Sequence, residues 1–129
     1  MPVFTKIQTI STLNDYHAGG SAACAMKFSI DNKYLFCSNA ADNSVGAFTI
    51  NAKTGMLSKM FVLPVSGDYP KDIAVFPDTK HLVSLNHESD TATFFHVDLD
   101  KKTIVMNGRE LKVNKGNCIA ILRIQEQTN

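Results

Sequence analysis

Two similar stretches of sequence decide how this chain folds: KFSIDNKYLFCSN at residues 27–39 and AVFPDTKHLVSLN at residues 74–86. Each stretch has an apolar run, a short polar turn and a second apolar run that ends in Asn. Four pairs of residues recur at one spacing, since 78 − 31 = 47: Asp31 and Asp78, Lys33 and Lys80, Leu35 and Leu82, Asn39 and Asn86. A period of about 40 to 50 residues indicates a repeated supersecondary unit.

The repeated unit contains four apolar segments separated by polar turns. Val, Ile, Phe, Tyr and Thr dominate the segments, as they do in β-strands. Asp, Asn, Gly and Pro gather in the turns, where special backbone angles are needed. No stretch shows a sustained helical period with caps, so the sequence predicts an all-β protein. The expected strands are CAMKFSI, KYLFCSN, SVGAFTI and LSKMFVLPV in the first copy, and DIAVF, HLVSLN, TATFFHV and TIVMNGRELKV in the second.

A four-stranded unit of this period is typical of a blade of a β-propeller. A blade has two apolar faces, so it is stable only between neighbours that cover both of them. We expect a partial propeller of about two complete blades, residues 24–66 and 71–113, with flanking strands of neighbouring blades at 3–13 and 118–124. Propellers close with roughly four to eight blades. The open flanks therefore predict self-association, a companion chain or a missing part of the protein.

Composition excludes several classes of partner. The chain has 129 residues, a hydrophobic fraction of 44% and a formal net charge of +1, with no basic stripe. We therefore expect a globular protein that binds neither nucleic acid nor a membrane surface. The first residues contain no apolar run typical of a signal peptide. Three cysteines without a CxxC pair are expected to be reduced thiols buried in strands, which predicts a cytoplasmic protein.

Two longer phrases resemble the lactonase family of seven-bladed β-propellers: FSIDNKYLFCSNAADNSVGAFTINAKTGML and VSGDYPKDIAVFPDTKHLVSLNHESDTATFFHVD. That family includes bacterial 6-phosphogluconolactonases and fungal 3-carboxy-cis,cis-muconate cyclases. The resemblance covers nearly the whole chain and places it on the C-terminal third of the family's longer sequence. The ending NKGNCIAI is similar to the family's terminal strand, which lies innermost in the last blade. The implied reaction is hydrolysis of 6-phosphogluconolactone, a carbohydrate-metabolism step without a cofactor.

The resemblance also implies where a site would lie, at the entry to each inner strand and in the loop after the second strand. By position, the candidate catalytic residues are Lys71, Asp72 and His87, and the candidate substrate-binding residues are Lys27, Asn39, Asn86 and Glu88. Lactone hydrolysis needs a base that activates water and a cation or donor for the developing oxyanion. His87 is a candidate base, and Lys71 is a candidate anchor for an anion.

Each candidate also has a plain structural interpretation. Lys71 is then a solvated lysine or the ion-pair partner of Asp72, which itself serves as a turn acceptor. The two strand-ending asparagines satisfy backbone groups. His87 and Glu88 then belong to a polar loop. The four histidines show no metal-ligand spacing, so no metal site is predicted.

Two positions depart from the family's pattern. The family commonly has an Arg where this chain has Ala40, and often an acidic residue where it has Ala25. The His and Glu usually assigned to the chemistry lie on earlier blades. One interpretation is therefore a lactonase portion that binds a sugar lactone only when other blades complete it and is inactive alone. The alternative is a non-catalytic, truncated propeller that acts as an oligomeric or protein-interaction module.

Overall fold

The structure is a computed structural model that describes residues 1–17 and 19–125. Throughout this part of the chain the regular structure is β, with no helix and hence no helix that could span a membrane. The first sheet has the order β1 (Ala23–Phe28), β2 (Tyr34–Asn39), β3 (Ser44–Ile50) and β4 (Leu57–Pro64). The second has the order β5 (Pro70–Val75), β6 (His81–Asn86), β7 (Thr91–Asp98) and β8 (Thr103–Met106), and β9 (Leu111–Lys112) also pairs with β7. All neighbours are antiparallel, which confirms the predicted fold class.

The repeated turn has the same structure in both sheets. Asp31 Oδ1 accepts a hydrogen bond from the Lys33 N–H at 3.0 Å, and Asp78 Oδ1 accepts one from the Lys80 N–H at 2.8 Å. The residues in between have left-handed backbone angles: Asn32 (φ 59°) and Thr79 (φ 56°). An aspartate that bonds the main chain two residues ahead stabilises such a turn locally. The recurrence in sequence is therefore a recurrence of one hairpin.

Both inner strands begin with a β-bulge. The ladder between β1 and β2 steps from Ala23 to Ala25, and the ladder between β5 and β6 steps from Pro70 to Asp72. The residues left out are 47 positions apart, Cys24 and Lys71. Because a bulge residue is outside the ladder, its side chain is re-aimed relative to its neighbours.

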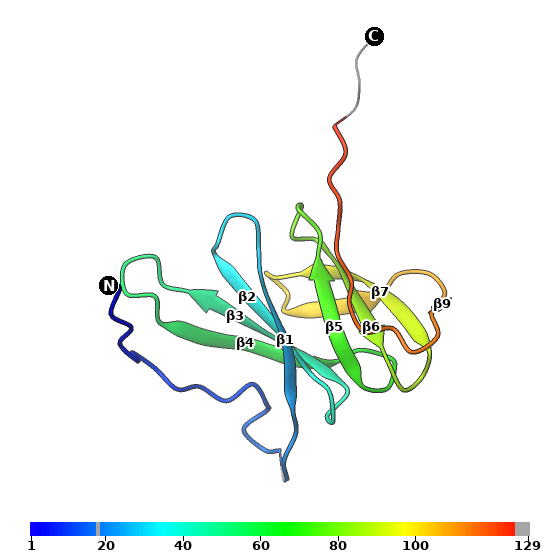
Figure 1. Ribbon diagram of the computed structural model, residues 1–129, viewed down its shortest axis with the longest axis horizontal. Coiled ribbons are helices and arrows are strands. Elements are labelled where there is room, and N and C mark those ends of the chain that lie inside the picture. Colours follow the sequence, from blue (N-terminus) through cyan, green and yellow to red (C-terminus); the bar gives the residue numbers. More distant parts are fainter. Residues whose placement is uncertain (18, 126–129) are drawn as a thin grey trace.

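The main hydrophobic core lies between the two sheets. It contains Phe36, Val45, Ala47, Phe61, Val65, Ile73, Leu82, Phe95 and Val97. Figure 1 shows the sheets as neighbouring blades with β1 and β5 side by side near the middle of the molecule. A smaller cluster lies on the outer face of each sheet, around Leu35 in the first and Val83 in the second. This arrangement is that of two consecutive blades of a propeller.

The segments expected as flanking strands lie on these outer faces but form no ladder. No strand is assigned in residues 1–17 or 113–125. The Gln8 side chain exchanges two hydrogen bonds with the main chain of Leu57, at 2.9 and 2.7 Å. Ile10 packs on the first sheet, and Ile119 and Ile121 pack on the second. A ladder needs a second strand in the hydrogen-bonding direction, and no described strand lies there.

The fourth strand of the second sheet also differs from the prediction of a single segment, TIVMNGRELKV. It is divided into β8 and β9, which both pair with β7. Between them Gly108 has a φ of 80°, an angle that glycine adopts without strain. The chain therefore leaves the sheet at this point and returns to it four residues later.

Candidate functional site

Most candidate residues lie at one end of the two sheets, which we call the entry end. Here β1 and β5 begin and β2 and β6 finish, since Ala23 pairs with Asn39 and Pro70 pairs with Asn86. The entry end therefore collects the strand-ending asparagines, the bulges and the loops 65–69 and 113–117. The recurrence at 47 residues brings equivalent positions of both copies to the same edge.

Asp72 is the most connected of the candidates. It is buried, with 7% of its surface exposed. Its Oδ2 accepts a hydrogen bond from the Ile119 N–H at 3.0 Å, and its Oδ1 lies 3.4 Å from Lys27 Nζ on β1. Asp72 thus joins the first blade, the second blade and the segment that follows. The expected pairing of Asp72 with Lys71 is replaced by pairing with Lys27, because the bulge takes Lys71 out of the ladder.

Lys71 is the cation that this arrangement leaves available. Its side chain is part-exposed, and within residues 1–17 and 19–125 it belongs to no ion pair. Its neighbours on either side, Pro70 and Asp72, are buried. Lys71 therefore presents an uncompensated positive charge from a rigid strand start, as an anion anchor requires.

His87 has a defined ring orientation. Its Nδ1 lies 3.0 Å from the carbonyl oxygen of Gly116. A carbonyl only accepts, so Nδ1 is the donor and Nε2 is left as the acceptor in the neutral ring. The main-chain N–H of His87 donates to the Tyr69 carbonyl, and the Tyr69 ring lies edge-on at 6.5 Å between centroids. The ring is therefore held so that Nε2 can take a proton from water.

Glu88 belongs to a charged group that includes a residue missed in the sequence. Glu88 Oε1 lies 3.9 Å from His87 Nε2, and Glu88 Oε2 lies 3.4 Å from Lys115 Nζ. Lys115 also donates its main-chain N–H to Asp90 Oδ1 at 2.9 Å. The first blade has the same type of bond, from the Tyr69 N–H to Asn43 Oδ1 at 2.8 Å. The two acceptors are 47 residues apart, since 90 − 43 = 47, but the two donors are 46 apart, since 115 − 69 = 46. The repeat therefore indicates Asp90 as an acceptor but does not identify Lys115.

The asparagines Asn39 and Asn86 are placed differently from the other candidates. Both are fully buried, with 0% of their surface exposed. The Asn86 amide donates to the hydroxyls of Thr91 and Thr93, at 3.2 and 3.0 Å. The Asn39 amide donates to the Thr12 carbonyl at 2.8 Å. The expected bond to a backbone group is therefore found for Asn39, whereas Asn86 bonds only side-chain hydroxyls. Neither side chain is exposed to a substrate.

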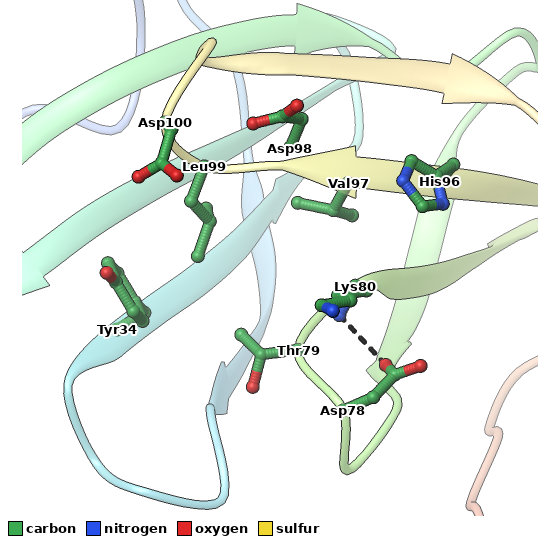
Figure 2. Close-up of a pocket in the computed structure, with 9 residues that line it drawn as sticks. All are labelled: Tyr34, Asp78, Thr79, Lys80, His96, Val97, Asp98, Leu99 and Asp100. Atoms are coloured by element: carbon green, nitrogen blue, oxygen red, sulfur yellow. Dashed lines mark hydrogen bonds between the residues drawn. The ribbon is translucent and has the colours of Figure 1, made fainter.

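A hollow of about 460 Å³ lies at the opposite end of the sheets, away from all of these candidates. Figure 2 shows the residues around it, among them Tyr34, Asp78, Asp98 and Asp100. Asp78 and Asp98 already accept main-chain hydrogen bonds from Lys80 and Lys101. Their carboxylates are thus used to close turns. His96 and Asp100 also line the hollow, but none of the site residues that the sequence predicted lies there.

Comparison with known proteins gives one consistent family. A family model described as "Lactonase, 7-bladed beta-propeller" matches residues 2–121. A 6-phosphogluconolactonase of Bacillus subtilis is 23% identical over 119 residues, which are 92% of this chain and 34% of that protein. A 6-phosphogluconolactonase of Formosa agariphila is 31% identical over 86 residues, which are 65% of this chain and 24% of that protein. The chain spans about a third of the length of the curated relatives it matches.

Solved structures show the same fold. A protein from Lactobacillus plantarum superposes with a TM-score of 0.74 at 26% identity, over 84% of this chain and 32% of that one. The periplasmic gluconolactonase of Pseudomonas aeruginosa superposes with a TM-score of 0.76 at 22% identity, over 84% of this chain and 30% of that one. In both cases the match is to a portion of a larger structure.

Proposed function

Because this chain belongs to the lactonase family of seven-bladed β-propellers, we propose that its entry end forms part of a channel site that hydrolyses a sugar lactone. Relatives named 6-phosphogluconolactonase support a substrate of the 6-phosphogluconolactone type. The observation that carries the proposal is that Lys71, which makes no ion pair among the described residues, is presented by a bulge beside β6, the strand that His87 follows. The phosphate of a phosphorylated lactone needs a cationic anchor of this kind.

The proposed roles follow from the contacts. His87 Nε2 accepts a proton from water, whose oxygen attacks the lactone carbonyl carbon. The ring C–O bond then breaks, and the His87 imidazolium gives its proton to the leaving oxygen. The products on one open chain are a hydroxyl and a carboxylic acid, which ionises to a carboxylate. Lys71 binds the phosphate or the developing oxyanion. Asp72 and Lys27 touch no substrate in this scheme, since their ion pair holds β1 against β5 and so positions the bulge.

Hydrolysis by this chain alone is not expected. The first blade supplies Ala40 where the second has His87, and Ala25 where the second has Asp72. The candidate base and the candidate anion anchor thus both come from the second blade. We propose that turnover needs residues outside this chain, and we expect no hydrolysis of 6-phosphogluconolactone above its spontaneous rate.

Binding of the reaction product, 6-phosphogluconate, tests the proposed site separately from turnover. In ¹⁵N-resolved NMR titrations we expect saturable shifts at Lys71, Asp72 and His87. Lys71→Ala should weaken binding at least about tenfold, the effect of losing one charged hydrogen bond. Lys33→Ala, in a turn at the opposite end, is the matched control and should leave binding unchanged. Shifts that gather instead around residues 78–80 and 98–100, or no saturable shift at all, would contradict the proposed site.

A second function is favoured by the outer face of the first blade. Met26, Phe28 and Ile30 are 66%, 60% and 61% exposed on or beside β1. Clusters of exposed apolar side chains mark interaction surfaces on soluble proteins. The alternative proposal is therefore a non-catalytic module that binds a second copy of itself or a companion chain through this face.

A further inference from the structure

Two histidines outside the entry end lie directly opposite each other on neighbouring strands. His81 on β6 pairs in register with His96 on β7. Directly opposite residues of an antiparallel pair have their side chains on the same face of the sheet. The two rings are 5.3 Å apart between centroids, with an angle of 79° between their planes. The sequence separates them by 15 positions, since 96 − 81 = 15, so that only the hairpin reveals the pair.

The ring of His81 is fixed in place by its neighbours. His81 Nδ1 lies 2.6 Å from Asp78 Oδ2, and the Phe76 ring stands edge-on at 6.0 Å between centroids. The side chain is 39% exposed. A carboxylate on one ring nitrogen is the usual second-shell partner of a metal-binding histidine, because it orients the ring and makes the other nitrogen more basic. His81 Nε2 is therefore prepared as a ligand atom.

His96 provides a second nitrogen at a suitable distance. It is exposed, and within the described residues neither of its ring nitrogens makes a hydrogen bond or an ion pair. With zinc–nitrogen bonds of about 2.0 Å, each ring centroid lies about 3.2 Å from the metal. A tetrahedral angle then separates the centroids by about 5.2 Å, close to the observed separation of 5.3 Å.

From this geometry we propose that His81 and His96 form a two-histidine site for a divalent transition-metal ion such as Zn²⁺. Asp78 is the positioning residue of the site. No group of three or more metal-ligating side chains exists among the described residues. Two imidazole nitrogens therefore supply the protein ligands, and water completes the coordination. Imidazole ligands favour Cu²⁺ over Zn²⁺ and Ni²⁺ by the general order of affinities.

Calorimetric titration of the chain with Zn²⁺ tests this site. The prediction that all three cysteines are buried is wrong for Cys24 and Cys118, which are exposed, and holds for Cys37. Because exposed thiols also bind zinc, the titration uses a background in which Cys24 and Cys118 are changed to Ser. We expect one site, weakened at least about tenfold by His81→Ala or by His96→Ala. Asp78→Asn keeps an oxygen for the Lys80 N–H but removes the carboxylate, and should also weaken binding about tenfold.

His87→Gln is the matched control and should leave zinc binding unchanged. Cu²⁺ broadening of histidine NMR signals gives a second measurement that needs no His substitution. Signals of His81 and His96 should disappear first. The proposal would be overturned if the control lost as much zinc affinity as the His→Ala variants, or if neither His→Ala change had an effect. Earlier broadening of the His17 or His87 signals by Cu²⁺ would also overturn it.

Discussion

At the scale of single residues, Asn39 and Asn86 are equivalent buried side chains that differ in their hydrogen bonds. Asn86 Oδ1 accepts a hydrogen bond from Ser84 Oγ at 2.7 Å, whereas Asn39 Oδ1 is buried without a hydrogen-bond partner. The first blade has Cys37 at the position of Ser84, since 84 − 37 = 47, and a thiol is a weak donor. The two copies thus share the asparagine but not the complete network around it.

This difference predicts unequal effects of truncation. Asn86→Ala removes three hydrogen bonds, to Ser84, Thr91 and Thr93, and leaves these hydroxyls without their amide partner. We expect a loss of about 2–4 kcal/mol in the free energy of unfolding, from one or two buried polar groups left unpaired. Asn39→Ala removes an amide whose oxygen already lacks a hydrogen-bond partner. It should lower the free energy of unfolding by about 1–2 kcal/mol. Urea unfolding followed by circular dichroism measures both, and an equal or reversed order would contradict the interpretation.

The repeat could be used to predict which single residues are equivalent, but not which ones touch. Asp31 and Asp78 bond within their own turns, so their roles follow from local sequence. The ion pair of Lys27 with Asp72 joins two blades, and the bulge decides that Lys71 is left out of it. Contacts between blades depend on how the sheets pack, which the period of 47 residues does not specify.

At the scale of elements, the two repeated hairpins make the fold sensitive to acid. The pKa of Asp31 is lowered from its ordinary value of 3.8 by hydrogen bonds from the Ser29 hydroxyl and the Lys33 N–H. For Asp78, burial raises the pKa, but hydrogen bonds from the Lys80 N–H and His81 outweigh it and the net pKa is lowered. Both carboxylates are therefore stabilised in their charged form by the folded hairpin.

The sign of the pH effect follows from these directions. A carboxylate whose folded pKa is lowered contributes stability that is complete above its unfolded value, and loses it as the pH falls through the folded value. The urea concentration at the midpoint of unfolding should therefore decrease as the pH is lowered below about 4. The decrease should be less steep in the Asp31→Asn, Asp78→Asn double variant. Asp100→Asn, in a turn without such a bond among the described residues, is the control. A double variant as acid-sensitive as the wild type would contradict this explanation.

The loop that crosses from the first blade to the second depends on a glycine. A Cβ atom at Gly67 would lie 2.3 Å from Asn86 Nδ2 and 2.5 Å from Asn86 Cγ, closer than atoms can approach. Gly67→Ala should therefore destabilise the fold by about 2 kcal/mol or more, the cost of overpacking a buried site. Gly20 has the same position in the first copy, since 67 − 20 = 47, and no atom lies within 4 Å of its Cβ position. Gly20→Ala is expected to change thermal stability by less than about 0.5 kcal/mol, and similar losses in both variants would argue against the contact.

Elements with local turn signals could be predicted from sequence, and those that depend on a neighbour could not. The hairpins and all eight apolar segments of the two copies have strands within them, because alternating apolar residues and Asp-containing turns favour them locally. The segments at 3–13 and 118–124 have equally strand-like sequences but lack a ladder. Strand-like composition is not enough without a pairing strand.

At the scale of the whole molecule, the exposed apolar face of the first blade predicts self-association. Phe28 and Met26 lie in β1, and Ile7 of the N-terminal segment covers this face only in part, since it remains 59% exposed. Burying such side chains favours association by about 25 cal/mol per Å². Sedimentation velocity should show concentration-dependent association, reduced by Phe28→Lys. Thr103→Lys, an exposed change on β8, should leave association unchanged, and a monomer at all concentrations would exclude this face as an interface.

The central claim is that the chain forms two consecutive propeller blades packed through one shared core. Methyl and aromatic NOE spectroscopy tests it most directly, because the main cluster combines Phe36, Val45 and Phe61 of the first blade with Ile73, Leu82 and Phe95 of the second. We expect abundant NOEs between these two groups of side chains, together with cross-strand NOEs within each sheet. Cross-strand NOEs inside the sheets without any between the two groups, or sequential NOEs typical of helices, would contradict the account.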